Sequence, residues 1–348
     1  MNWKSVMVAG IAAAAILQLL AFRTLPAFAT DAAVREAAKK EGEVVVYGSW
    51  PKAGMVAMAD AFTKSTGVKV TFTNIASSEV IQRFLAEREA SRAVVDVVNI
   101  SALAPFVDFR KRNLLLQYRS PELAAYPKSY QDSDGYWMNV GHSAEVIVYN
   151  TERVPAGKAP KNWQDLTDPM FAKVLAVPDI KGGGTGYLWY YAMRETLGVS
   201  FHEKIGALKP QLLVSTASMG QAVQSGEAFV AAGILHYTGT NALKADPKAP
   251  IRVVWPNPLP LTDLVVGISS TAPHPNAAKT FVDFIASEQG QKLGVAEQGM
   301  LSPRPGIKTE GVPDLSGFKL YSIAADRLEA YFKVEPEYNA EFARLYAK

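Results

Sequence analysis

The pattern of apolar and polar residues along the chain is of two kinds, one typical of strands and one typical of helices. Short continuous apolar runs of strand length are followed by segments whose apolar residues recur at helical spacing. The runs lie at residues 43–47, 68–72, 94–100, 145–149, 174–177, 212–214, 229–235, 251–255 and 264–268. The helical segments lie at 55–64, 80–88, 102–112, 187–197, 201–208, 219–226, 240–245, 276–287, 288–298, 323–332 and 337–346. Strands that alternate with helices predict an α/β protein with open, mainly parallel sheets flanked by helices.

The alternation occurs in two series along the sequence. A loop-rich stretch before residue 145, which contains the turn Asp132-Ser133-Asp134-Gly135, separates them. A chain of 348 residues is long enough for two hydrophobic cores. In open α/β sheets, ligands bind beyond the carboxyl ends of the strands. We therefore expect two α/β lobes with a ligand-binding cleft between them.

The first 29 residues have the order of an export signal. Lys4 precedes an apolar run at residues 6–22, and Ala27-Phe28-Ala29 follows, with small residues at the two positions that a signal peptidase recognises. The alternative is an uncleaved membrane anchor, but the apolar run is short for a membrane span and contains Gln18. We therefore expect a signal peptide at 1–29 and a periplasmic mature protein.

Charge and composition exclude several classes of function. The chain has 36 Lys and Arg against 33 Asp and Glu, and residues 1–29 contain Lys4 and Arg23 but no acid. The mature chain is thus nearly neutral, whereas a nucleic-acid-binding protein needs a basic face. The absence of Cys excludes thiolate zinc sites, iron–sulfur clusters and a Cys nucleophile. The four His residues lack metal-site spacing, and no P-loop, dinucleotide fingerprint or serine-hydrolase elbow occurs. We expect no enzyme activity, no metal, no cofactor and no nucleic-acid partner.

The loops that leave the strands carry the candidate ligand-binding residues. They offer small hydroxyls, backbone amides at a helix start, or an aromatic ring, and helix starts attract anions. The candidates are Ser49, Trp50, Ser77, Ser78, Ser101, Gly184, Thr185, Gly186 and Tyr237.

The glycine-rich loop at residues 181–186 and Asp263 each allow two interpretations. The glycines of Lys181-Gly182-Gly183-Gly184-Thr185-Gly186 allow backbone amides to bend toward a ligand; the alternative is a flexible loop in which Thr185 caps the next helix. Asp263, next to the apolar run at 264–268, is either an ordinary strand residue or a contact for a cationic group.

Several stretches in order resemble the periplasmic solute-binding proteins of ABC importers, and in particular the group of ferric-ion-binding proteins. The matching stretches lie at residues 44–51, 62–72, 95–98, 148–151, 163–169, 221–227, 275–284 and 287–291. The resemblance implies a type II binding-protein fold, with two lobes joined by crossing hinge strands and one ligand in the cleft. It also implies delivery of the ligand to a membrane permease. We place the first lobe at 30–145 plus 268–318 and the second at 146–267 plus 319–348.

The chain departs from the iron-binding pattern at the positions that would hold the metal. The family's iron-binding members use adjacent tyrosines where this sequence has His236-Tyr237-Thr238-Gly239, and Ser101 replaces a carboxylate. Ferric iron prefers several anionic oxygens. The anion-binding positions Gly184, Thr185 and Gly186 do match, and Ser143 adds a hydroxyl.

We therefore expect a monomeric periplasmic binding protein that captures a small organic anion, namely a carboxylate, phosphonate or phosphate ester. Trp50 or Tyr237 would pack on its organic part. The second hypothesis is Fe(III) binding with a synergistic anion. The third is an exported hydrolase on the same fold, with Ser49 or Ser101 as its reactive hydroxyl.

Overall fold

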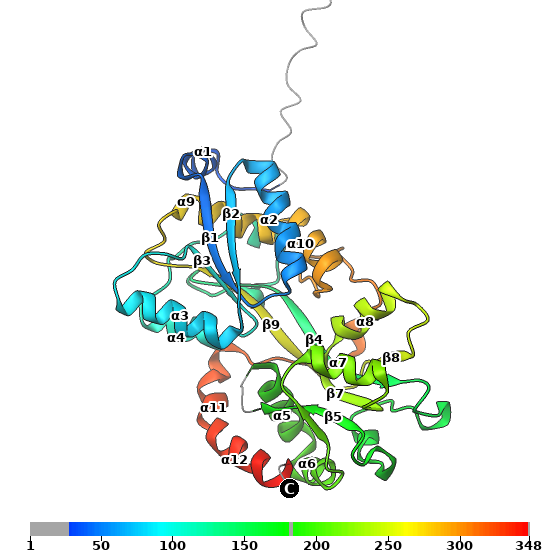
Figure 1. Cartoon of the computed structure of the whole chain (residues 1–348). Coiled ribbons are helices and arrows are strands. Elements are labelled where there is room, and N and C mark those ends of the chain that lie inside the picture. The colour runs from blue at the N-terminus through cyan, green and yellow to red at the C-terminus, as the bar shows by residue number, and fades with distance from the viewer. Residues whose placement is uncertain (1–27, 181–183, 347–348) are drawn as a thin grey trace, which may run out of the picture.

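Two lobes joined by long strands make up the computed structural model, which describes residues 28–180 and 184–346 (Figure 1). Strands β4 (Met138–Asn150) and β9 (Leu259–Ile268) run antiparallel to each other and pass from one lobe into the other. The predicted α/β fold with two lobes and crossing strands is confirmed. The crossing in β4 lies at Ala144 and Glu145, because β4 pairs with β9 up to Ala144 and with β7 from Glu145 onward.

The first lobe holds the parallel strands β1, β2 and β3. Their order in the sheet is β2-β1-β3-β9-β4, and β3 pairs with β9 in antiparallel orientation. The strands are β1 (Glu43–Gly48), β2 (Lys69–Asn74) and β3 (Val97–Ile100). The helices are α1 (Ala32–Glu41), α2 (Lys52–Thr66), α3 (Ser77–Glu89), α4 (Ala104–Lys111), α9 (Pro275–Ala286) and α10 (Glu288–Leu293). All four residues of β3 are buried, as the continuous apolar run predicts.

The second lobe continues the sheet in the order β4-β7-β5-β6, and β8 pairs with β4. The strands are β5 (Leu175–Pro178), β6 (Gln211–Leu213), β7 (Val230–Leu235) and β8 (Ile251–Val254). The helices are α5 (Gly184–Leu197), α6 (Val199–Ala207), α7 (Thr216–Ser225), α8 (His236–Ala245), α11 (Leu328–Lys333) and α12 (Glu335–Tyr346). The last two helices pack on this lobe, where the Tyr190 hydroxyl donates to Glu341 at 2.7 Å.

Some elements differ from the sequence expectation. Helix α1 was not predicted, and α8 begins at His236 rather than at residue 240, so Tyr237 lies in a first helical turn and not in a loop. Val312, Leu315 and Phe318 pack against a hydrophobic cluster that contains residues of β7 and β8. The short strand β10 (Leu320–Tyr321) pairs there with Leu259 and Pro260. Within the described ranges, no helix has the length and hydrophobicity of a membrane span.

Candidate functional site

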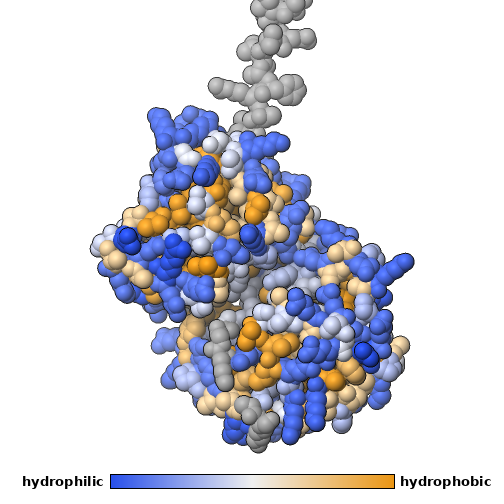
Figure 2. Space-filling model, viewed as in Figure 1, coloured by the Kyte–Doolittle hydropathy of each residue, from blue (hydrophilic) through white to orange (hydrophobic). Residues whose placement is uncertain are grey.

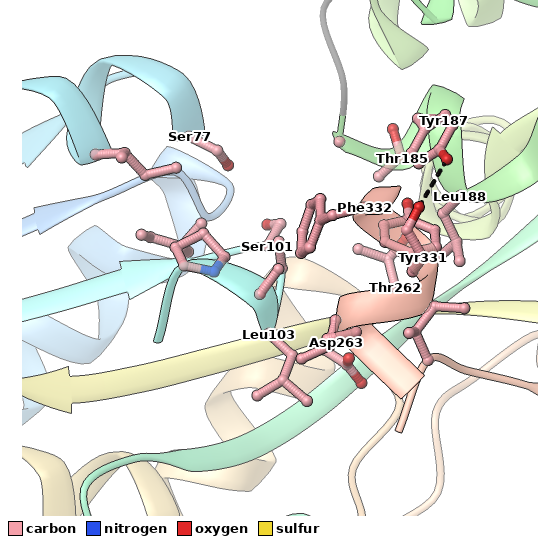
Figure 3. Close-up of a pocket in the computed structure, with 18 of the residues that line it drawn as sticks. Ser77, Ser101, Leu103, Thr185, Tyr187, Leu188, Thr262, Asp263, Tyr331 and Phe332 are labelled. Atoms are coloured by element: carbon pink, nitrogen blue, oxygen red, sulfur yellow. Dashed lines mark hydrogen bonds between the residues drawn. The ribbon is translucent and has the colours of Figure 1, made fainter. Parts of the chain in front are cut away.

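A cavity of about 400 Å³ lies between the two lobes. The space-filling view shows a hollow between the lobes, and the close-up shows the residues around the cavity (Figures 2 and 3). The first lobe contributes the starts of α3 and α4, and the second contributes the start of α5 and helix α11. Strand β9 crosses from one lobe to the other between these walls. The predicted residues on this cavity are Ser77, Ser78, Ser101, Gly184, Thr185 and Asp263.

Three helices begin at the cavity wall. Helix α3 starts at Ser77, α4 at Ala104 and α5 at Gly184, and all three starts line the cavity. The residues before α3 and α4 are Ala76 and Leu103, and neither provides a side-chain cap. The first amides of a helix have no partner within that helix, and the dipole adds partial positive charge there. At α4, Pro105 has no N–H and the Phe106 amide donates to the Leu103 carbonyl oxygen at 3.0 Å. The start of α3 is therefore the part of this wall that is best suited to an anionic group.

A hydroxyl network links the strand ends of the first lobe. The Ser77 hydroxyl donates to the Ser49 hydroxyl at 2.9 Å, and the Ser101 amide donates to the same Ser49 oxygen at 3.2 Å. Strands β1 and β3 are neighbours in the sheet, so their carboxyl ends bring Ser49 and Ser101 together. The ends of β1 and β3 and the start of α3 therefore meet at the Ser49 hydroxyl.

A second, smaller cavity of about 30 Å³ adjoins the first. Ser49, Ser143 and Tyr237 line it, and Ser101 and Thr262 line both cavities. A space of this size holds a water molecule or a single small group rather than an organic ligand. The predicted residues are therefore divided between a large cavity and a small one that share a wall.

Two predicted residues do not reach either cavity. Trp50 is fully buried in the core of the first lobe, so the prediction that its ring packs on the ligand is wrong. Gly186 is also buried, and a Cβ there would lie 3.1 Å from the Asp179 carbonyl oxygen and from Pro178 Cβ. Glycine at that position allows α5 to pack closely on the end of β5. Lys181, Gly182 and Gly183 lie outside the described residues.

The charged side chains on the large cavity are carboxylates. Asp108, Asp263 and Glu335 line it, and no Lys or Arg does so among the residues that the structure describes. Asp108 is exposed and pairs with Arg112 at 3.5 Å. Asp263 Oδ1 accepts a hydrogen bond from Asn139 at 2.7 Å and lies 3.2 Å from His142 Nδ1.

The C-terminal helices contribute a wall that sequence reasoning did not identify. Five residues of this segment line the cavity: Ile323, Leu328, Tyr331, Phe332 and Glu335. The apolar spacing of residues 323–332 predicts a helix but gives no indication of the lobe on which it packs. Thr262 was missed for a similar reason, because only the crossing of β9 between the lobes places it at both cavities.

Among the described residues, the site offers hydrogen-bonding groups and no preformed pair of nucleophile and base. Ser49 accepts two hydrogen bonds and has no His or carboxylate partner among the described contacts. In the described part of the chain, no group of three His, Asp or Glu side chains is placed to hold a metal ion. Burial raises the pKa of Tyr237 to about 12.

Comparison with known proteins places the chain in a family. The family model for bacterial extracellular solute-binding proteins matches residues 93–315. The Fe(3+)-binding periplasmic protein of Serratia marcescens is 25% identical over 288 residues, covering 74% of this chain and 78% of that protein. A Salmonella typhimurium protein, assigned provisionally as a 2-aminoethylphosphonate-binding periplasmic protein, is 24% identical over 284 residues, covering 78% and 79%.

Solved structures show the same fold. Iron-bound HitA from Pseudomonas aeruginosa superposes with a TM-score of 0.74 at 20% identity, over 85% of this chain and 99% of that one. AfuA from Actinobacillus pleuropneumoniae, with fructose-6-phosphate bound, gives a TM-score of 0.75 at 21% identity, over 88% and 99%. The fold is that of type II periplasmic binding proteins, and the chain belongs to the family of bacterial extracellular solute-binding proteins.

Proposed function

We propose that this protein captures a small organic anion in the cavity between its lobes and delivers it to an ABC permease. The observation that carries the proposal is the meeting of three helix starts at one cavity, two of them without a side-chain cap. Free amides at the start of α3 and the Ser101 and Thr185 hydroxyls supply donors for a carboxylate, phosphonate or phosphate ester. The proposal includes a signal peptide at 1–29, a periplasmic location and a monomeric state.

The apolar part of the cavity favours an organic ligand over an inorganic ion. Ile81, Leu103, Leu188 and Leu328 contribute to its lining, and a volume of about 400 Å³ exceeds the needs of a bare phosphate. Such a lining gains free energy by removing the ligand's carbon atoms from water. The walls belong to different lobes, so a ligand that touches both favours a closed form.

A thermal-shift screen of the mature protein with carboxylates, phosphonates and phosphate esters tests the proposal. Saturation at 100 times the dissociation constant adds about 2.7 kcal/mol, which corresponds to a rise in Tm of several degrees at about 2–4 °C per kcal/mol. Ser101→Ala should weaken binding of the hit by about fivefold, because one hydrogen bond contributes about 1 kcal/mol. Ser65→Ala removes an exposed hydroxyl at the end of α2 and serves as the matched control.

Two results would contradict the proposal. Ferric citrate could produce a visible tyrosinate-to-iron absorption band while no organic anion shifts the Tm, which would support the iron-binding alternative. Hydrolysis of a bound ester that is lost in Ser49→Ala or Ser101→Ala would support the hydrolase alternative.

A further inference from the structure

The C-terminal helices give the cavity a wall whose chemistry differs from that of the helix starts. Tyr331 and Phe332 come from α11, and Glu335 is the first residue of α12. Phe332 is 43% exposed although it is a large apolar residue, and Figure 3 shows it pointing from α11 toward Ser101. An aromatic ring that remains accessible in a cavity can contact a bound ligand through its face.

Glu335 is the carboxylate on this wall that lacks a partner. It is partly buried, and burial is the only influence on the pKa of its carboxyl group; it has no hydrogen bond or ion pair with the residues that the structure describes. The other two carboxylates on the cavity are paired, Asp108 with Arg112 and Asp263 with Asn139 and His142. Burial raises the pKa of Glu335, as expected for a carboxylate without a neighbouring positive charge.

The neighbouring tyrosines do not neutralise Glu335. The Tyr187 hydroxyl donates to the Tyr331 carbonyl oxygen at 3.0 Å, and the two rings lie 4.7 Å apart between centroids. This part of the wall therefore presents aromatic faces together with an unpaired acceptor. A ring face and a carboxylate both attract a cation, and an ammonium group satisfies both at once.

We propose that the ligand is zwitterionic, with its anionic group at the start of α3 and an ammonium group between Phe332 and Glu335. This inference rests on the proposed function and narrows its ligand class to amino-substituted organic anions. It also accounts for the described cavity lining, which combines helix-start amides on one wall with carboxylates and no Lys or Arg. The two ends of one molecule would then hold the two lobes together.

Matched pairs of probes test the inference by isothermal titration. Phosphonates and carboxylates with chains of two to four carbons are each compared with and without a terminal amine. We expect the wild type to bind the aminated member about 10- to 100-fold more tightly, the range for a hydrogen bond to a charged group. Glu335→Gln should remove most of this preference while leaving the affinity of the amine-free probe within about twofold.

Two further variants separate binding from stability. Phe332→Leu should reduce the preference for the amine by about 2- to 30-fold, the range for a cation over an aromatic face. Glu329→Gln is the control for Glu335→Gln. It removes an exposed carboxylate of α11 that lies outside the cavity, and it should leave the affinities for the aminated and the amine-free probe unchanged. Glu335 also lies in the first turn of α12, so the Tm of each ligand-free variant is measured alongside.

The outcomes distinguish the inference from the function on which it rests. Equal binding of both members of every pair, a preference for the amine-free probe, or an equal loss for both probes in Glu335→Gln would overturn the inference alone. Binding of another organic anion when no aminated probe binds would also overturn it alone. Failure of every organic anion would overturn the proposed function and the inference together.

Discussion

At the scale of single residues, the crossing between the lobes contains a buried acid. Glu145 is fully buried in β4, and the Thr262 hydroxyl of β9 donates to its Oε1 at 3.2 Å. Oε2 has no partner among the described residues. Burial raises the pKa of Glu145 well above its usual value, which favours the neutral carboxylic acid in the folded protein.

Glu145→Gln should therefore become more stable, relative to the wild type, as pH rises. The pKa of Glu145 is higher in the folded chain than in the unfolded one, so the unfolded chain loses this proton first as pH rises above about 4.5. In the wild type, each further pH unit costs about 1.4 kcal/mol until the folded-state pKa is reached. Gln does not ionise and avoids this cost.

Urea unfolding at about pH 4, 5.5 and 7 measures the difference. The exposed Glu203→Gln on α6 is the control, and its difference from the wild type should change much less over this range. A difference for Glu145→Gln that does not depend on pH would show that this carboxyl ionises normally in the fold.

At the scale of elements, the position of the C-terminal helix depends on a glycine in another helix. A Cβ on Gly206 of α6 would lie only 2.3 Å from the Leu345 carbonyl oxygen of α12. The Tyr190 and Arg194 side chains of α5 also hold α12 by hydrogen bonds to Glu341. These contacts fix the segment that supplies Glu335 to the cavity.

Gly206→Ala should displace α12 and lower the free energy of unfolding by about 1–3 kcal/mol, the usual cost of overpacking. Hydrogen exchange should show faster opening of residues 335–346 in this variant. Gly157→Ala is the control, because no atom lies within 4 Å of a Cβ at that position. Unchanged protection of α12 in Gly206→Ala would contradict the packing argument.

At the scale of the whole molecule, two buried histidines connect elements that are distant in sequence. His236 Nδ1 accepts from the Ala144 amide at 3.1 Å, and Nε2 lies 2.7 Å from the Gly299 carbonyl oxygen, which fixes a neutral ring with its proton on Nε2. His202 joins α6 to Tyr346 of α12 at 2.6 Å. Burial lowers the pKa of His236 to about 4 and that of His202 to about 3.

Stability should fall on acidification because both histidines must stay neutral in the fold. Their folded-state pKa values lie below about 6.5, so the unfolded chain binds these protons first as pH falls. Their contribution is complete above about pH 6.5 and is lost progressively toward about pH 4 for His236 and about pH 3 for His202, at up to about 1.4 kcal/mol per pH unit for each residue. His236→Gln should reduce the slope of unfolding free energy against pH by up to about 1.4 kcal/mol per pH unit. Unfolding free energies between pH 7 and 4.5 measure it, and an unchanged slope would refute the assignment.

The sequence predicted the elements far better than it predicted their ends. Strand β3 and helix α9 follow directly from their apolar patterns. In contrast, β4 extends back to Met138, because polar residues such as Asn139 and His142 lie within a strand that the lobes cover on both sides. Period and composition cannot reveal a strand whose polar side chains are buried by tertiary contacts.

The sequence predicted only part of the candidate site, because the direction of a side chain also depends on tertiary contacts. Ser77, Ser101 and Thr185 follow from the rule that strand ends and helix starts face the ligand, and all three line the large cavity. Trp50 also lies directly after a strand, but its ring turns into the core. The direction of a side chain after a strand depends on packing, which the local sequence does not specify.

The sequence by itself determined the α/β alternation, the two lobes, the near-neutral charge and the loops that would face the ligand, because periodicity and composition are local properties. The tertiary structure decided which loops share a cavity, that Thr262 joins two cavities, and that α11 and α12 complete the wall. Those features depend on contacts between segments more than a hundred residues apart, such as the one between Tyr187 and Tyr331. Such contacts are set by the packing of complete elements, and no local pattern encodes them.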